Sequence, residues 1–235
     1  MIKGLLYLVP ATLGSPDTRL TIPSGMADLV RDIQVYIVEN ERSARRYLKL
    51  LDREIDIDRL TFFELNEHTP TEEVPSFLGP AEKGQDTAII SEAGMPGVAD
   101  PGAAVVRMAH EKGISVIPLT GPSSVLLGLM ASGFNGQQFT FHGYLPIQQS
   151  QRVRKIREME KEMQRTGATQ IFIEAPYRND KLMADLLLHC HPATLLCVAA
   201  DITMETEMIR SQPISRWKKN KPSLHKRPAI FLLGR

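Results

Sequence analysis

The sequence predicts an α/β protein with two α/β domains, residues 1–119 and residues 120–235. Three observations lead to this fold class. Short apolar, β-prone runs alternate with helical segments through the first half, which is typical of a parallel sheet with right-handed crossovers. Two loops rich in glycine and proline, at residues 93–102 and 120–124, each follow one of these runs. Beyond residue 124 the alternation becomes irregular, which indicates a second domain with a mixed sheet.

The first half is expected to contain five strands joined by helices. Each expected strand is a short apolar run that ends at glycine, proline or polar residues. The strands cover residues 4–9, 34–38, 60–65, 87–91 and 115–119, and the helices lie around residues 27–33, 41–53, 71–83 and 101–112. In the last helix, Asp100 is expected to be the cap and Pro101 the first helical residue.

The second half is expected to contain four strands and three helices. The strands cover residues 139–144, 169–173, 195–200 and 229–233, and the helices cover residues 125–131, residues 148–165 and a segment that ends at residue 187. The periodicity of the long charged helix predicts that one apolar side faces the core. Its methionines are expected to fill gaps in that core. That side consists of Val153, Ile156, Met159 and Met163.

The composition is that of an ordinary globular protein. The chain is 43% hydrophobic and 23% charged, and its only cysteines are Cys190 and Cys197. We therefore expect no disulfides and a cytoplasmic location. No apolar run is long enough to span a bilayer, so no membrane partner is expected. His189, Cys190 and His191 are adjacent, but no second pair of ligands stands at a suitable spacing, and no metal site is expected.

The charge is unevenly distributed along the chain. Residues 1–120 carry a net charge of −6 and residues 121–235 a net charge of +7. A basic half is typical of a protein with an anionic partner such as a nucleic acid, although solvated helix faces give the same balance. The basic, turn-rich segment 216–227, with Lys218, Lys219 and Lys221, is the first candidate for such a contact.

The two glycine-proline loops are the first candidates for a ligand site. Glycine lets the backbone approach a ligand closely, and proline fixes the chain between such points. In open parallel sheets, ligands bind at the carboxyl ends of the strands, where both loops are expected. Acidic side chains follow expected strands in both halves: Glu39, Glu92, Asp100 and Glu174. They could line a cleft between the domains, although each is also explained as a cap or an ion pair.

Six segments together resemble the tetrapyrrole methylase family. They are YLVPATLG at 7–14, VENER at 38–42, ISEAGMPGVADPG at 90–102, IPLTGPSS at 117–124, FHGYLP at 141–146 and FIEAPYR at 172–178. Within the family, the sequence is most similar to the branch that methylates the 2′-hydroxyl of a cytidine in small-subunit ribosomal RNA. The segments occur in the family's order and span nearly the whole chain.

The resemblance implies a homodimeric methyltransferase that holds S-adenosylmethionine between two α/β domains. Backbone amides in its loops can bind the carboxylate of the cofactor, and small residues leave room for the adenosine. The positions that the resemblance assigns to the cofactor are Pro10, Gly14, Ala93, Gly94, Met95, Pro96, Thr120, Gly121, Ser123 and Ser124.

RNA is the expected methyl acceptor, and a corrin or porphyrin is the alternative within the family. The sequence departs from the RNA-methylating branch at positions that include Asn40, Glu92 and Arg227. A protein that binds the cofactor without catalysis is therefore a third alternative.

Glu39 and Glu174 are the candidate catalytic residues. A 2′-hydroxyl is a poor nucleophile until a base takes its proton, and a carboxylate can serve as that base. Arg42, Asp100 and Arg178 are the candidate substrate contacts, and the two arginines are expected to orient the glutamates or to contact a phosphate or propionate. The alternative is that the glutamates form two separate ion pairs that fix loops.

Overall fold

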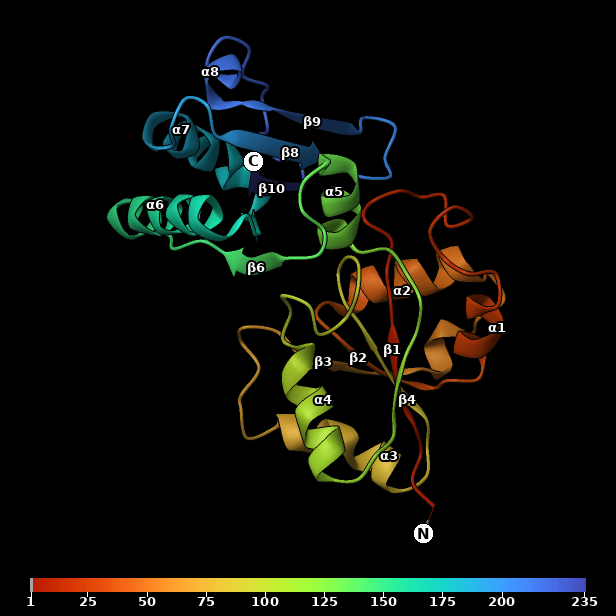
Figure 1. The fold of residues 1–235 in the computed structure, drawn as a ribbon. Helices are drawn as coiled ribbons and strands as arrows, with labels where there is room; N and C mark the ends of the chain where they lie inside the picture. The colour runs from red at the N-terminus through yellow and green to blue at the C-terminus, as the bar shows by residue number, and fades with distance from the viewer. Residues whose placement is uncertain (1) are drawn as a thin grey trace. The chain divides into compact units, whose positions relative to one another are not determined.

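The computed structural model of the chain describes residues 2–235 (Figure 1). The chain divides between Ser123 and Ser124 into two compact units. We call residues 1–123 the first unit and residues 124–235 the second unit. Each unit has its own five-stranded sheet.

The first unit is built on a parallel sheet with the strand order β3-β2-β4-β1-β5. Its strands are β1 (Leu6–Val9), β2 (Val35–Val38), β3 (Thr61–Glu64), β4 (Thr87–Ile90) and β5 (Val116–Pro118). Every adjacent pair is parallel, as the alternation of apolar runs and helices predicts. The four helices are α1 (Met26–Arg31), α2 (Glu41–Leu51), α3 (Gly79–Glu82) and α4 (Gly102–Glu111).

Alternation along the strands gives the first unit two apolar cores. On one face, Tyr36 and Val38 pack with Leu48 of α2, and on the other, Ile37 and Ile89 pack with apolar residues of α3 and α4. Successive side chains of a strand point to opposite faces, so both faces of the sheet are covered. The carboxyl ends of the strands therefore remain as the open edge, and the connecting loops gather there.

The second unit is built on a mixed sheet with the strand order β6-β7-β10-β8-β9. Its strands are β6 (Phe139–Tyr144), β7 (Thr169–Ile173), β8 (Leu195–Ala200), β9 (Met208–Pro213) and β10 (Ala229–Gly234). Only β6 and β7 are parallel, and the other three pairs are antiparallel. The helices are α5 (Ser124–Ser132), α6 (Gln149–Thr166), α7 (Asn179–His189) and α8 (Ile214–Trp217).

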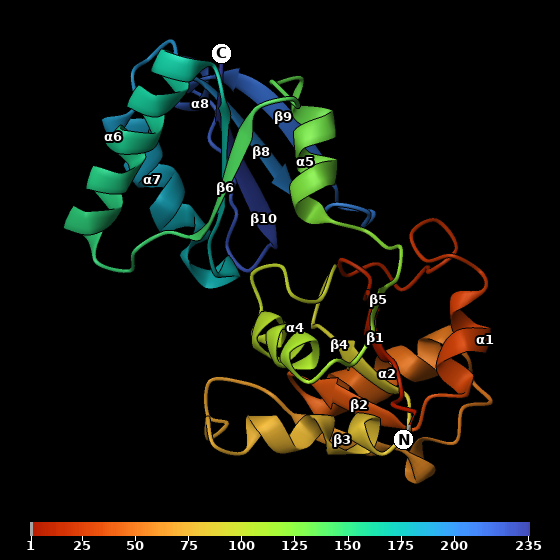
Figure 2. The same cartoon turned by 60° about the horizontal axis from the view of Figure 1, so that its bottom comes forward.

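Helices cover both faces of the second sheet. Figure 2 shows α5 on one face and α6 and α7 on the other. Gly128 allows α5 to lie close to β10, because a Cβ atom there would stand 2.9 Å from Ile230 Cγ2. The other face holds a large core that includes Met159, Phe172 and Phe231.

The single tryptophan and both cysteines lie inside the second unit. Trp217 is fully buried, and its indole N–H donates to the carbonyl of Leu196 at 2.9 Å. Burial raises the pKa of the Cys190 thiol to about 12 and also raises the pKa of the Cys197 thiol. Burial therefore disfavours the thiolate, which is the reactive form, at both cysteines.

The core side of α6 differs from the expectation at its first position. Arg152, not Val153, shares the buried stripe with Ile156, Met159 and Met163. Residue 152 lies four residues before Ile156 and so on the same helical face, whereas residue 153 is rotated off it. The buried charge of Arg152 is matched by Asp185 of α7, since its Nε donates to Asp185 Oδ2 at 2.8 Å.

Three local expectations are also wrong. Residues 71–83 do not form one helix but a 3₁₀ segment, Val74–Leu78, followed by the single turn of α3. Helix α4 begins at Gly102, one residue later than expected, and Pro101 is its N-cap residue. Strand β9 and the short helix α8 were not expected, although both are well formed. No helix within residues 2–235 is both long and apolar enough to cross a membrane.

Candidate functional site

Three loops of the first unit meet at the carboxyl edge of its sheet. They follow β1, β4 and β5. The loop after β1 pairs with the loop after β4, because the amide of Ala11 donates to Gly94 O at 2.8 Å and the amide of Gly94 donates to Ala11 O at 3.2 Å. The loop after β5 packs against the first, since Gly121 lies directly against Pro10.

Two glycines make this convergence possible. A Cβ atom on Gly121 would stand 2.3 Å from both Cβ and Cγ of Pro10, so no larger residue fits without movement. Gly94 has φ +73°, and a Cβ atom there would stand 3.3 Å from Leu13 Cδ2 and 3.4 Å from Pro122 O. Glycine at 121 therefore leaves room for the Pro10 ring, and glycine at 94 allows a positive φ in a tightly packed loop.

The convergence brings together most of the positions that the resemblance assigns to the cofactor. Pro10, Gly94 and Gly121 are in one contact region, and their sequence neighbours continue the same three loops. Those neighbours are Gly14, Ala93, Met95, Pro96, Thr120 and Ser123. Ser124 is the first residue of α5 and belongs to the second unit.

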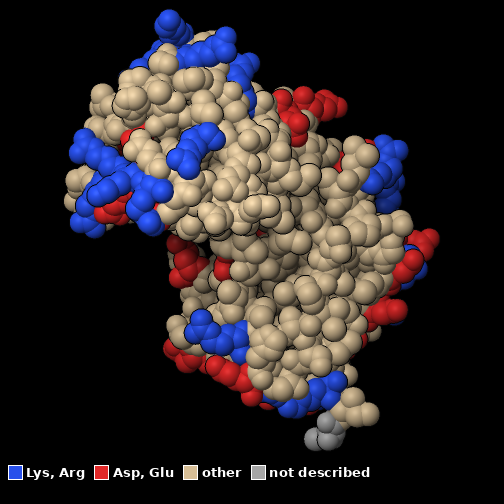
Figure 3. Space-filling view, viewed as in Figure 1, with Lys and Arg blue, Asp and Glu red and all other residues tan. Residues whose placement is uncertain are grey.

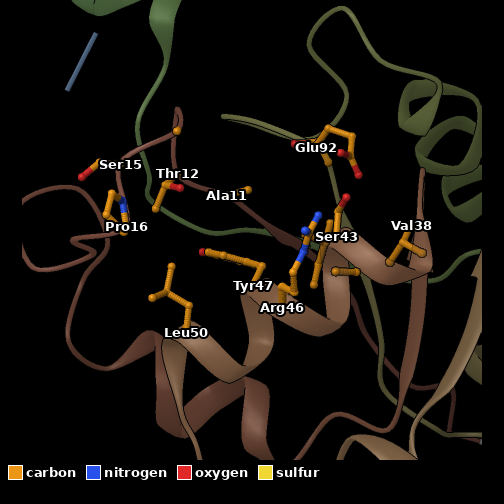
Figure 4. A pocket seen from close by; sticks show the side chains of 14 residues that line it. Ala11, Thr12, Ser15, Pro16, Val38, Ser43, Arg46, Tyr47, Leu50 and Glu92 are labelled. Carbon is orange, nitrogen blue, oxygen red and sulfur yellow. The ribbon is translucent and has the colours of Figure 1, made fainter. Parts of the chain in front are cut away.

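A pocket of about 430 Å³ lies between the loop after β1 and helix α2. Figure 4 shows the side chains of Ser43, Arg46, Tyr47 and Leu50 rising from α2 toward this loop. The loop contributes Ala11, Thr12, Gly14, Ser15 and Pro16, and the ends of the central strands contribute Val38, Ile90, Ser91 and Glu92. The volume falls in the range of pockets that hold small molecules.

The pocket combines an apolar floor with polar groups. Tyr47 is fixed in place, because its hydroxyl donates to Pro10 O at 2.5 Å and burial raises its pKa. Hydroxyl groups of Thr12, Ser15 and Ser43 and the cationic side chain of Arg46 surround it. Such a lining suits a planar polar group that carries hydrogen-bonding atoms on its edge.

Three carboxylates follow the central strands next to this pocket. Glu39 Oε1 accepts a hydrogen bond from the amide of Glu92 at 3.3 Å. Burial raises the pKa of Glu39, and the nearby carboxylates of Asp100 and Glu92 raise it further. A cavity of about 10 Å³ lies beside Glu39 and Asp100, close to the least room that one water molecule needs. No group of His, Cys, Asp and Glu in residues 2–235 has the arrangement of a metal site.

Asp100 organises its own loop. Its Oδ1 accepts the amide of Gly97 at 2.8 Å and the amide of Gly102 at 2.7 Å. Burial raises the pKa of Asp100, although these two hydrogen bonds act in the opposite direction. Asp100 is therefore not the N-cap residue, which is Pro101, but its side chain still accepts a hydrogen bond from the first residue of α4.

Glu39 and Arg42 do not form the expected pair. Arg42 is exposed on the first turn of α2 and contacts no carboxylate among residues 2–235. Asn40, between them, is the N-cap residue of α2, and its Oδ1 accepts the amide of Ser43 at 3.0 Å. The helix that begins after Asn40 turns Arg42 away from Glu39 at the end of β2. The guanidinium group is therefore available to an external anion.

Glu174 and Arg178, by contrast, are paired as expected. Arg178 Nη2 lies 2.6 Å from Glu174 Oε1, and the same oxygen accepts from Arg178 Nε at 2.9 Å and from the amide of Ala175 at 2.7 Å. Only 1% of the Glu174 side chain is exposed. This geometry fits the reading of the pair as an ion pair that fixes its loop.

Arg227, one of the departures from the RNA-methylating branch, forms an ion pair with Asp201. Arg227 Nε donates to Asp201 Oδ2 at 2.7 Å, and the Thr206 hydroxyl donates to the same oxygen at 2.8 Å. Asp201 lies at the turn after β8 with φ +53°. The departure at residue 227 therefore has a structural role in this chain, since Arg227 holds the turn after β8.

Sequence reasoning missed the contribution of α2. Ser43, Arg46 and Tyr47 line the pocket, yet none of them was among the expected site residues. The available signal was the spacing of its basic residues, which recur every three or four positions and therefore share one face.

Comparisons with known proteins agree with this fold. A family model described as Tetrapyrrole (Corrin/Porphyrin) Methylases matches residues 6–216. The protein named ribosomal RNA small subunit methyltransferase I from Micromonospora olivasterospora is 34% identical over 207 residues, which are 87% of this chain and 61% of that protein. The protein of the same name from Leptospira biflexa is 29% identical over 232 residues, which are 99% of this chain and 91% of that one.

A solved structure shows the same fold. The uroporphyrin-III C-methyl transferase from Thermus thermophilus, complexed with S-adenosylhomocysteine, has a TM-score of 0.59 at 18% identity and covers 99% of this chain and 98% of its own. The two-sheet α/β fold expected from the sequence is thereby confirmed. The chain belongs to the tetrapyrrole (corrin/porphyrin) methylase family.

Proposed function

We propose that the chain is an S-adenosylmethionine-dependent methyltransferase that transfers a methyl group to the 2′-hydroxyl of a nucleotide in small-subunit ribosomal RNA. The observation that carries this proposal is the convergence of three glycine-containing loops at one edge of the parallel sheet, in a chain of this family. The names of the two relatives support RNA as the acceptor.

The loops have the donor set that S-adenosylmethionine needs. Backbone amides and the hydroxyls of Thr120 and Ser123 suit its carboxylate and ribose, and the nearby carboxylates of Glu39 and Glu92 suit its positive charge. The remaining positions proposed for the cofactor are Pro10, Gly14, Ala93, Gly94, Met95, Pro96, Gly121 and Ser124. When bound, the cofactor would supply an electrophilic methyl group, and a neighbour bound to S-adenosylhomocysteine supports this assignment.

Glu39 is the proposed general base. Its pKa is raised by burial and by two neighbouring carboxylates, and a base with a raised pKa takes a hydroxyl proton more readily. Glu174 is the weaker candidate, because Oε1 already accepts three hydrogen bonds. Among the proposed substrate contacts, Arg42 is exposed and unpaired, whereas Asp100 and Arg178 are engaged within their own loops.

The test is transfer of a labelled methyl group from S-adenosylmethionine. The acceptors are an in vitro transcript of small-subunit ribosomal RNA, purified small ribosomal subunits and a porphyrin. We expect label on the ribose of the RNA, in the free transcript or the subunit. Glu39→Gln should lower turnover by about a hundredfold while the affinity for the cofactor stays nearly unchanged. Label on the porphyrin alone, or cofactor binding with no transfer, would contradict the proposal.

A homodimer and a cytoplasmic location are part of the same proposal. The homodimer rests on the resemblance to the family, and the cytoplasmic location rests on the low cysteine content, with which the two free, buried cysteines agree. Light scattering on the purified chain measures the dimer directly, and a mass of one chain at micromolar concentration would contradict it.

A further inference from the structure

Helix α2 carries a row of exposed cations on one face. Arg42, Arg46 and Lys49 are spaced by four and three residues, so they share that face. Arg53 follows just beyond the end of the helix, and its carbonyl accepts a hydrogen bond from Lys49 Nζ at 2.9 Å. We call these four residues the basic track.

The charges of the basic track are not neutralised by the protein. Arg42, Arg46, Lys49 and Arg53 form no ion pair with any carboxylate in residues 2–235. Most acidic side chains nearby already have other partners, although the charge of Lys49 also helps to lower the pKa of Asp52. Asp52 pairs with Arg31, Glu41 and Asp58 pair with Arg45, and Asp56 pairs with Arg59.

A shallow groove of about 690 Å³ runs along the track and leads toward the pocket of the candidate site. Four cations, Arg45, Arg46, Lys49 and Arg53, line the groove together with Leu50 and Ile57, and the carboxylates Asp56 and Asp58 stand at it as ion-pair partners of Arg59 and Arg45. Arg46 and Leu50 also line the pocket of about 430 Å³ between α2 and the loop after β1. The row of cations therefore borders, at Arg46, a pocket whose lining includes Gly14, a position proposed for the cofactor.

The spacing of the track suits a nucleic-acid strand. Seven residues of helix, from Arg42 to Lys49, rise by about 10 Å, which is about the axial rise of three stacked nucleotides at ~3.4 Å each. Guanidinium groups bind phosphate in two-point geometry. A protein partner would instead call for a cluster of large apolar anchors at the centre of the surface, whereas only Leu50 is an exposed apolar side chain among the residues that line this groove.

We infer that the basic track binds the phosphodiester backbone of the RNA acceptor and leads the target nucleotide into the adjacent pocket. This inference rests on the proposed function. It assigns the RNA contact to the acidic half of the chain, not to the basic segment with Lys218, Lys219 and Lys221. Figure 3 shows Lys and Arg side chains of the second unit gathered over α6 and α8.

Two triple variants with equal loss of charge test the assignment. One is Arg46→Gln, Lys49→Gln and Arg53→Gln, and the control is Lys218→Gln, Lys219→Gln and Lys221→Gln. Binding to the small-subunit ribosomal RNA transcript and to intact small ribosomal subunits is measured against KCl concentration. Melting temperatures and the affinity for S-adenosylmethionine are measured to show that both variants are folded.

The track variant should bind the transcript about 100-fold more weakly at ~0.1 M salt. The slope of log affinity against log salt should fall by about 2, because each lost contact with a single strand removes ~0.7. The control should keep the wild-type affinity to within a few fold. Methyl transfer should show a raised KM for RNA with little change in kcat.

Each other outcome is informative. Equal losses in both variants, or a loss confined to the control, would overturn the assignment to α2 while the proposed function stands. A loss seen with ribosomal subunits but not with the free transcript would assign the track to a ribosomal protein and also overturn it. If the wild type itself methylates neither RNA probe, the proposed function fails, and that result is separate from the comparison of variants.

Discussion

Replacement of Gly121 by alanine tests the convergence of the three loops most directly. The new Cβ atom would stand 2.3 Å from Pro10 Cβ and Cγ, whereas carbon atoms in contact prefer about 3.5–4.0 Å. One of the two loops must therefore move by more than about 1 Å. Overpacking of this kind costs about 1–3 kcal/mol. For a chain of 235 residues, ~2 kcal/mol corresponds to a fall of about 4–8 °C in melting temperature.

The assay is differential scanning calorimetry of the ligand-free chain, with Gly79→Ala as the matched control. A Cβ atom on Gly79 meets nothing within 4 Å, and its φ of −55° suits any residue, so the control should melt at or slightly above the wild-type temperature. In a Pro10→Gly background, Gly121→Ala should cost little, because both clashing atoms are gone. An unchanged melting temperature for Gly121→Ala, or the same cost in both backgrounds, would refute the packing described here.

Three further predictions concern single side chains. Asp185→Ala leaves the Arg152 charge unpaired in the core and should destabilise the chain by about 3–5 kcal/mol, measured by thermal unfolding. The double change Arg152→Met and Asp185→Leu removes both charges and should therefore destabilise the chain much less. Asn40→Ala removes the cap of α2 and should cost about 1 kcal/mol, while Asn40→Asp should melt like wild type. The raised pKa of Glu39 means that its protonated form favours folding, an effect that is lost as pH rises through the folded-state pKa. Glu39→Gln should therefore raise the melting temperature at about pH 8 but not at about pH 4, and a lower value at pH 8 would contradict the desolvation of this carboxylate.

The regular parts of the fold follow from local pattern. Residues 139–144, 169–173 and 195–200 form strands with the expected bounds, because their apolar or alternating runs are long enough to define a strand. Strand β9 was missed because its sequence, MIRSQP, exposes Arg210 and Ser211 at the edge of the sheet. It is held by pairing with β8 and by the Ser211 hydroxyl, which donates to Ser132 O of α5 at 2.7 Å, and a local sequence pattern shows neither partner.

Tertiary partners account for the other errors. Arg152 stands at a core position of α6, but its charge argues for solvent until Asp185 of another helix is known. Arg42 follows Glu39 by three residues, and only the cap at Asn40 reveals that α2 separates them. The loops that meet at Pro10, Gly94 and Gly121 could be predicted as a group from their place in a parallel sheet, whereas the contacts between them could not.

The row of cations on α2 shows why the net charge of half a chain does not predict the charge of one surface within it. Residues 1–120 carry a net charge of −6, yet their acidic side chains near α2 pair with other arginines. Local pairing, and not the total, decides which charges remain available to a partner.

The positions of the aromatic and sulfur reporters have a practical consequence. Trp217, Cys190 and Cys197 all lie in the second unit, and the sequence contains no other tryptophan or cysteine. Indole fluorescence and thiol labelling will therefore follow the opening of residues 124–235 and remain silent when residues 1–123 unfold alone. A difference between these signals and the loss of helical circular dichroism would separate the two transitions in the natural sequence, without any added probe.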